Sequence, residues 1–536
     1  MQQAREERGC PTISSPLPEA GIVSRPRVIA ILVAVLFPSF MTALDNTIVN
    51  VALPQIRAEL GMGDASLKWV AAVYPLILAS LLLLGGRLTD TVGRRATLLL
   101  GVAVFTMSSV GCSVATSGAV LISFRGLQGS GAALILPATL AILSHDLPPR
   151  ARNAAFSATT ATLALALACG PVVSGVMTQH LGWQSVFAMN VPLGCASLLV
   201  GFTLPRPSAA ARSSRAPSTT VSLRGVALAC CSLAALANCL IEGPEQGFGS
   251  FPVVTSEVIA LGSAVALSYE LRLRRNAALR LLFRQRPFVG GIVTQLLGGL
   301  GVTGVYFFTS QFLQNGLGLT PTSAGLTFIP VALSLIVMAP FIAGMARRWG
   351  DGRISAAGLL VIGLGLLMVA LGSIGRSLVH ILPGLSAIGL GSALAIPLTT
   401  RALESSPDHL SGIAAGLFSA VREASGVVGI ALVGAMVSFV EHTAADAGAD
   451  APDAFLTGYQ AGLCLAAALV GAGAPVALWA LRDRRPKRPG ALRDHRSKGR
   501  GALHPAAPPR GRDQPEPGRS PNHTEPPTPN RPQGLS

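Results

Sequence analysis

Long apolar stretches recur along the chain and are separated by short polar segments. A bilayer core about 30 Å thick is crossed by about 17–25 helical residues, and fourteen stretches reach that range. Uninterrupted apolar runs of this length are typical of membrane-spanning helices rather than of strands. The pattern therefore predicts an all-α integral membrane protein with fourteen spans. The stretches lie near 28–53, 67–86, 96–114, 119–143, 153–178, 184–204, 223–241, 253–269, 288–313, 321–345, 354–373, 378–400, 411–438 and 456–481.

The polar segments between these runs alternate in charge. If the N-terminus lies inside the cell, the inner segments hold most of the arginines, while the outer segments hold only three basic residues and several acidic ones. Because Lys and Arg in short loops favour the cytoplasmic side, we expect an even number of spans with both termini in the cytoplasm. The outer basic residues are Arg57, Lys68 and Arg376, and the outer acidic ones include Glu242, Glu245, Glu441, Asp446, Asp450 and Asp453.

The runs also divide the chain into parts. A weakened copy of the inner loop at 86–95 occurs at 344–353, as in transporters whose duplicated halves are related by an axis along the membrane normal. The first run is too long for a signal-peptide core, and the Arg- and Pro-rich end of the chain is expected to be disordered. The expected parts are a cytoplasmic segment 1–27, a six-helix bundle 28–204, a linker with two inserted spans 205–287, a second six-helix bundle 288–481 and a cytoplasmic tail 482–536.

Composition supports the membrane assignment and narrows the function. The 536 residues are 50% hydrophobic and 12% charged, against about 25% charged in soluble domains. The net charge of +16 does not indicate nucleic acid, because the basic residues lie in short segments between apolar runs. Lysine is nearly absent while Arg, Ala and Gly abound, which is typical of a GC-rich bacterial genome. No phosphate-binding P-loop, metal-type cysteine spacing or histidine constellation occurs, so we expect no cofactor, no metal and no enzyme activity.

Two opposite charges stand out within the apolar runs. Asp45 lies in the first run and Arg125 in the fourth, and a charge at the bilayer centre costs about 2.5–3.5 kcal/mol on insertion scales. The helical rise places them roughly 12 Å and 9 Å from the outer ends of their runs. If these helices adjoin, the two residues can pair. A carboxylate balanced between burial and a paired cation suits proton coupling, and a purely structural ion pair is the alternative.

The inner loop between the second and third runs combines two glycines with three arginines and one acid. The glycines would permit a tight turn, and the acid would clamp helix ends through charge-assisted hydrogen bonds. We interpret this segment as a conformational latch rather than a substrate site. Its residues are Gly86, Arg87, Asp90, Gly93, Arg94 and Arg95.

Two further features lie within the spans. The fifth run carries a small residue at every fourth position and a proline among them, a pattern typical of close helix packing beside a kink. The thirteenth run carries Arg422 and Glu423 near mid-membrane, where adjacent positions point about 100° apart. We therefore expect only one of the pair to face a cavity or the interface between the halves. The packing residues are Gly170, Pro171, Ser174 and Gly175.

Together these stretches resemble the major facilitator superfamily, and specifically its fourteen-helix drug:proton antiporter branch. The resemblance covers about residues 28–481, and it departs from the usual pattern at Ser174 (commonly Gly), Gln184 (commonly Arg) and Glu423 (commonly Gln). The matching stretches are Leu44–Pro54, Gly86–Arg95, Arg125–Pro137, Gly170–Gly175, Gly182–Gly194 and Val421–Gly426.

The resemblance implies two six-helix bundles with two extra central helices. It assigns proton coupling to Asp45 and Arg125, gating to Asp90, and export to the fifth-helix motif. The implied function is proton-coupled efflux of a hydrophobic small molecule, such as an antibiotic, by a monomer in the bacterial cell membrane, conferring resistance. The alternatives are a carrier for metabolite uptake or facilitated diffusion, and a membrane sensor or regulator with a transporter fold.

Overall fold

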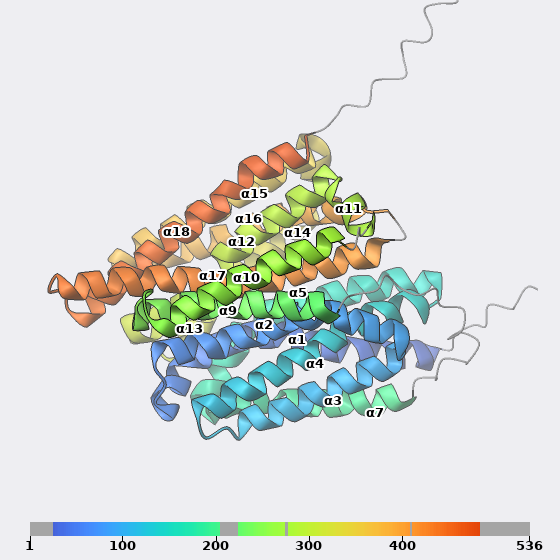
Figure 1. Cartoon of the computed structure of the whole chain (residues 1–536), viewed down its shortest axis with the longest axis horizontal. Coiled ribbons are helices and arrows are strands. Elements are labelled where there is room, and N and C mark those ends of the chain that lie inside the picture. The colour runs from blue at the N-terminus through green and yellow to red at the C-terminus, as the bar shows by residue number, and fades with distance from the viewer. Residues whose placement is uncertain (1–24, 204–222, 274–276, 408–409, 483–536) are drawn as a thin grey trace, which may run out of the picture. The chain divides into compact units, whose positions relative to one another are not determined.

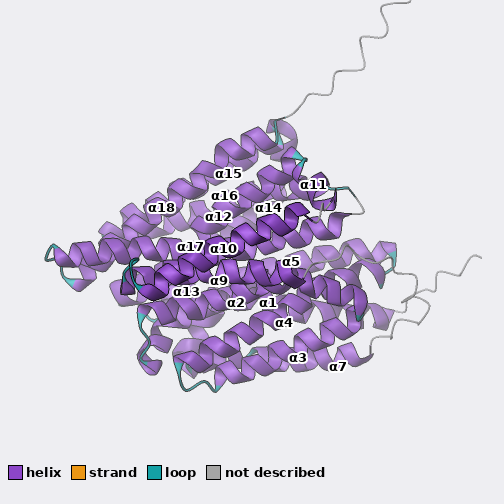
Figure 2. Cartoon of the chain, viewed as in Figure 1, coloured by secondary structure: helices purple, strands orange, loops and turns teal. Residues whose placement is uncertain are grey.

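A computed structural model describes residues 25–203, 223–273, 277–407 and 410–482. In these ranges the chain is helical with connecting loops and contains no strand (Figure 2). The fourteen predicted spans are confirmed, one helix or pair of helices for each. The expected N-terminal segment up to residue 24, the expected tail from residue 483, and the inner-loop arginines at 206, 212, 215, 274 and 275 lie outside the described residues.

The first six spans are followed by two inserted spans. The sixth span is made of two helices that meet at Met189. The elements are α1 (Arg25–Leu60), α2 (Asp64–Thr91), α3 (Arg94–Ser113), α4 (Gly118–His145), α5 (Pro149–Leu181), α6 (Gln184–Ala188) and α7 (Asn190–Thr203), and then the inserted α9 (Leu223–Gln246) and α10 (Phe251–Leu273).

The last six spans follow a short helix, α11. The ninth span ends in a π-helical turn, Phe312–Gly316, and the tenth is again made of two helices. The elements are α11 (Ala277–Phe283), α12 (Arg286–Gln311), α13 (Pro321–Leu326), α14 (Ile329–Trp349), α15 (Asp351–Ile374), α16 (Leu378–Glu404), α17 (Ser411–Asp446) and α18 (Ala451–Ala480).

The two sets of six spans repeat one packing scheme. In the first set α1 packs on α5 and α7, α4 packs on α2 and α3, and α3 packs on α7. In the second set α12 packs on α17 and α18, α16 packs on α14 and α15, and α15 packs on α18. Glycines make equivalent close approaches: a Cβ at Gly131 would lie 2.8 Å from the carbonyl of Gly101, and one at Gly391 would lie 2.5 Å from that of Gly358. Small residues at such crossings let membrane helices meet backbone to backbone.

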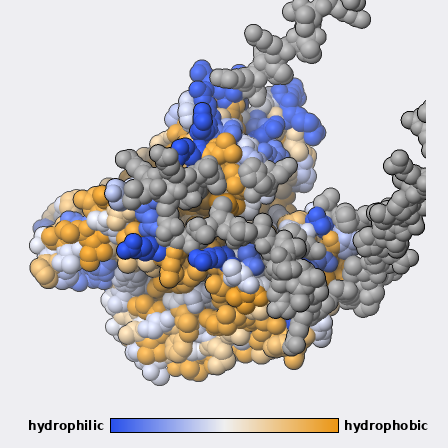
Figure 3. All heavy atoms as spheres, turned by 45° about the vertical axis from the view of Figure 1, so that its right-hand side comes forward, coloured by the Kyte–Doolittle hydropathy of each residue, from blue (hydrophilic) through white to orange (hydrophobic). Residues whose placement is uncertain are grey.

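The outer surface is apolar, as a lipid-facing surface must be. Large hydrophobic side chains are exposed on many spans, including Leu199, Phe202, Leu261, Val265 and Leu371, and apolar residues cover much of the visible face (Figure 3). The inserted α9 packs against both α2 and α17, and α10 packs on α9 (Figure 1). The halves meet through α2 with α17, α5 with α13 and α1 with α12, and this junction holds the candidate site.

Candidate functional site

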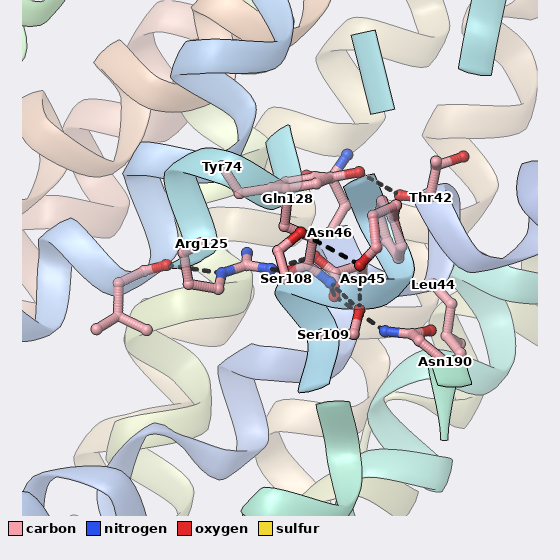
Figure 4. Close-up of polar contacts among 12 residues, drawn as sticks. Thr42, Leu44, Asp45, Asn46, Tyr74, Ser108, Ser109, Arg125, Gln128 and Asn190 are labelled. Atoms are coloured by element: carbon pink, nitrogen blue, oxygen red, sulfur yellow. Dashed lines mark hydrogen bonds and ion pairs between the residues drawn. The ribbon is translucent and has the colours of Figure 1, made fainter. Parts of the chain in front are cut away.

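A buried ion pair joins α1 to α4. The Nη1 of Arg125 donates to the Oδ2 of Asp45, and the exposed fractions of the two side chains are 1% and 0% (Figure 4). The predicted pairing of these two residues is therefore present in the structure. The predicted distance of Asp45 from the outer end of its helix rested on a first helix ending at Pro54, and that boundary is wrong. Helix α1 continues through this proline to Leu60, so Asp45 lies about 22 Å from the helix end.

The Asp45 carboxylate is held by side chains from two other helices, α4 and α7. Its Oδ1 accepts from the amide of Gln128, at 3.0 Å, and from that of Asn190, at 3.5 Å. The Gln128 amide also donates to Ser109 at 3.0 Å, while its carbonyl accepts from Arg125 at 2.9 Å. Gln128 lies one turn after Arg125 on α4, so both side chains face α1. The charged form of the carboxylate is thus surrounded by donors.

The Arg125 guanidinium has partners besides the carboxylate. Its Nε donates to the carbonyl of Val70 at 3.3 Å, and its central carbon lies 4.6 Å from the Tyr74 ring centroid and 5.8 Å from that of Phe187. Cation–π contacts of this kind are worth about 2 kcal/mol when desolvated. The Tyr74 hydroxyl in turn donates to the carbonyl of Thr42 at 3.0 Å. Helices α1, α2, α4, α6 and α7 are therefore tied to one ion pair.

This arrangement can change state by taking up one proton. A buried pair stabilises a fold weakly as long as both charges are present, because desolvation offsets their attraction. Protonating Asp45 removes one charge and leaves the buried cation with only neutral partners, which is unfavourable by several kcal/mol in the same surroundings. A single proton can therefore alter the relative energies of two helix arrangements, which is the chemistry required for coupling.

A cavity of about 430 Å³ lies between the two halves, beside this pair. It is lined by α1, α2, α5, α12, α15, α16 and α17, with apolar walls and scattered amides and hydroxyls. Asn46 of α1, the neighbour of Asp45, is part of the lining. A concave, largely apolar space with a few polar groups is typical of a small-molecule site.

The cavity is closed at the end of the bundle that carries the α1–α2 turn. There a Cβ at Gly175 of α5 would lie 2.3 Å from the carbonyl of Pro321, and one at Gly325 of α13 would lie 2.2 Å from that of Pro171. Gln314 also donates across the halves to the carbonyl of Val51 at 2.9 Å. The lining residues of α15 and α16 come instead from the halves of these helices nearer the opposite end, where the α2–α3 turn lies, and those of α5 come from its middle.

The packing stripe of α5 therefore has two partners. Besides the contacts with α13, a Cβ at Gly170 would lie 2.0 Å from the Thr47 hydroxyl of α1. Ser174 is buried between these glycines, and its hydroxyl has no partner within the described part of the chain. The sequence predicted close packing here, but it did not predict that the stripe faces two helices.

Arg422 and Glu423 lie together in the cavity lining. The Nη2 and Nε of Arg422 donate to Oε1 of Glu423 at 2.8 and 3.1 Å, and Asn46 donates to its Oε2 at 3.1 Å from the other half. Both residues belong to the lining, but only the Arg422 side chain is well exposed, 53% against 6% for Glu423. Their backbone positions diverge, but both side chains are long enough to bend toward each other and pair.

The expected latch is largely helical. Gly86, Arg87 and Asp90 lie in the last turns of α2, so Gly86 does not form a turn, and only Gly93 has the positive φ (109°) of one. The other two arginines tie α3 to its neighbours: Arg94 pairs with Asp146 after α4, and Arg95 donates to the carbonyl of Gly201 on α7 at 3.1 Å.

The second half repeats the α3–α4 pair with the charges exchanged. Asp351 at the start of α15 pairs with Arg401 in the last turn of α16. The base of the first half thus lies on the helix that carries the acid in the second. An ion pair therefore joins the corresponding helix ends in both halves, whichever of the two helices carries the arginine.

Three polar residues were misplaced or missed by reasoning from sequence. Lys68 was assigned to an outer loop, but it lies in α2, only 3% exposed, where its Nζ donates to Ser438 of α17 at 3.0 Å beside a second cavity of about 270 Å³. Gln128 could have been found from its i+3 spacing to Arg125, whereas Asn190 lies in the matching stretch Gly182–Gly194 without a feature that predicts its contact with Asp45.

The fold and the site define a membrane transporter: two similar six-helix bundles enclose a cavity, and a buried titratable pair lies beside it. A family model described as "Major Facilitator Superfamily" matches residues 35–430, and the chain belongs to this superfamily.

Relatives and solved structures agree with this assignment. The chain is 34% identical over 402 residues to "Multidrug resistance protein Stp" of Mycobacterium tuberculosis (strain CDC 1551 / Oshkosh), covering 74% of each chain. It is 32% identical over 436 residues to "Tetracenomycin C resistance and export protein" of Streptomyces glaucescens, covering 78% of each. Its fold is similar to that of an auto inhibited POT family peptide transporter, with a TM-score of 0.61, 17% identity, and coverage of 86% of this chain and 97% of the other.

Proposed function

We propose that this protein exports a hydrophobic small molecule, an antibiotic, from a bacterial cell in exchange for protons, and so confers resistance. The observation that carries the proposal is the cavity of about 430 Å³ that both halves line next to the buried Asp45–Arg125 pair. The printed functions of the two relatives, multidrug resistance and the export of tetracenomycin C, support export rather than uptake.

In this proposal both termini lie in the cytoplasm and the structure faces inward. The α5–α13 contacts then close the periplasmic or external side, and cargo reaches the cavity from the cytoplasm or the inner leaflet. The proposed working unit is a monomer.

A proton from outside drives the cycle by reaching Asp45. Once this carboxyl is neutral, Arg125 keeps only Gln128, the Val70 carbonyl and aromatic faces as partners. The present arrangement is then disfavoured, and the halves rearrange until the proton leaves on the other side. One charge crossing 100 mV supplies about 2.3 kcal/mol, enough for a cargo gradient of about 50-fold.

The test is a drug-susceptibility panel in an efflux-deficient host, followed by energised everted vesicles loaded outside with each compound to which resistance is gained. We expect accumulation that a protonophore abolishes. Asp45→Asn should abolish it, while Asp453→Asn, at an exposed acid paired with Arg376, should not. Vesicles that fail to accumulate a compound to which the cells became resistant would contradict export. Accumulation in right-side-out vesicles alone would indicate uptake.

A further inference from the structure

The cavity lining contains two charged side chains among the described residues, and they are not equally available. Glu423 is 6% exposed, and both of its oxygens already accept: Oε1 from Arg422 and Oε2 from Asn46. Its carboxylate is turned into the wall, so it is poorly placed to meet a cation in the cavity.

Arg422 is the available charge. Its side chain is 53% exposed, and only the edge formed by Nε and Nη2 is engaged with Glu423. Within the described part of the chain, Nη1 donates to no partner. A planar guanidinium can hold one carboxylate on each edge through parallel N–H donors. The open edge is therefore suited to an anionic oxygen pair.

The surroundings favour a hydrophobic body attached to that anion. Leu359, Ile362, Val302 and Ile430 line the same cavity, and Tyr306 presents an aromatic ring that stacks on Phe328 at 5.3 Å between centroids. Apolar walls lower the local dielectric, which strengthens a charge-assisted hydrogen bond made within the cavity.

We propose that the cargo is a hydrophobic acid, bearing a carboxylate or an ionised enol or phenol, and that Arg422 selects it. Asn46 and Glu423 are positioning residues, because they hold the inner edge of the guanidinium so that its outer edge faces the cavity. This inference rests on the proposed function, since it names the chemical class that the exporter accepts.

The test is equilibrium binding of two xanthene dyes of similar size to the purified full-length protein in nanodiscs near neutral pH, read by fluorescence anisotropy. Fluorescein is anionic, and tetramethylrhodamine methyl ester is cationic. We expect fluorescein to bind about 10- to 100-fold more tightly, as hydrogen bonds to a charged group allow. Equal binding, or tighter binding of the cationic ester, would overturn the proposal.

Variants assign any preference to the residue. Arg422→Gln should abolish the preference or reverse it, because the Glu423 carboxylate loses its partner, whereas Glu423→Gln should keep fluorescein binding. Arg422→Lys retains the charge without the fork, so the preference should weaken only partly; this variant serves if Arg422→Gln does not fold. Arg376→Gln, at an exposed arginine, is the matched control and should bind both dyes as the wild type does. Fluorescein binding unchanged in Arg422→Gln or in Arg422→Lys would refute the assignment.

Binding needs no proton gradient, which keeps the two proposals separable. If the dyes show the preference but energised vesicles export no compound, the exporter proposal fails and the selective site stands. If vesicles export compounds but neutral and cationic cargo are handled as well as acids, only the acid selectivity fails.

Discussion

Removing the charge of Asp45 alone should lower the free energy of unfolding much more than removing both charges of the ion pair. In Asp45→Asn the side chain keeps its shape, but Arg125 remains buried with Gln128 at 2.9 Å and Val70 at 3.3 Å as neutral acceptors. Breaking a buried pair from one side costs about 3–5 kcal/mol. We expect the lower end of this range, because the neutral acceptors and the Tyr74 face stay in place.

The double variant Asp45→Asn/Arg125→Gln removes both charges, so the uncompensated cation disappears. Replacement of a whole buried pair is often close to neutral, and the coupling between the two sites should appear as a recovery of most of the loss. The expected order of stability is wild type, then the double variant close behind, then Asp45→Asn well below.

Thermal unfolding of the purified protein, monitored through the labelling of buried cysteines such as Cys112 as they become exposed, measures this order. Asp45→Asn melting with the wild type, or the double variant melting as low as the single one, would refute the account of the pair given above. Proton-coupled export should be lost in both variants. A double variant that still exports under proton control would leave the pair with a structural role alone.

Three further variants test other parts of the structure. Gly325→Val places a side chain against the carbonyl of Pro171, where a Cβ would already lie 2.2 Å away, so the α5–α13 end should stay open and export should be lost. A cysteine placed at Gln314 in this variant should then react with a water-soluble maleimide, and an unreactive cysteine would contradict the prediction. Lys68→Met removes a buried ammonium that donates to one neutral hydroxyl, so the melting temperature should hold or rise, whereas a loss above about 1 kcal/mol would show that the ammonium itself holds α2 to α17. Arg376 has a left-handed φ of 45°, which costs about 1–2 kcal/mol for a residue with a Cβ, more than its exposed ion pair contributes to stability. Arg376→Gly should therefore match or exceed wild-type stability, and Arg376→Val should fall below it. A higher melting temperature for Arg376→Val than for Arg376→Gly would contradict the strain.

The spans and the Asp45–Arg125 pair could be predicted because each depends on a single strong physical constraint. Apolar runs of bilayer length have few alternatives to crossing the membrane, so all fourteen spans were found. An unpaired charge within the bilayer is energetically costly, so two opposite charges at similar expected depth are strongly favoured to pair. Gln128 and Asn190 carry no comparable cost, so nothing in the sequence required them to be near the carboxylate.

Other features could not be predicted, because they depend on which helices meet. The distance of Asp45 from the outer end of its helix was misjudged, because a proline does not always end a helix and α1 continues beyond Pro54. Lys68 was placed in a loop because a lone lysine near the end of a run looks like a boundary, whereas α17 supplies a buried partner hydroxyl for it. The pairing of Arg422 with Glu423 was not predicted, because two long side chains can meet despite the angle between their backbone positions.

The inserted helices make the two lateral sides of the cavity unequal. The halves meet along two seams, one between α2 and α17 and the other between α5 and α14. Helix α9 packs across the first seam, and α10 lies against α9, whereas among the described residues neither inserted helix packs closely on the second seam. Leu163 and Leu167 of α5 reach the cavity lining on that side. In the proposed export cycle, cargo entering sideways from the bilayer would therefore be restricted to the α5–α14 seam, and a substitution in α9 would change this restriction without altering the cavity lining.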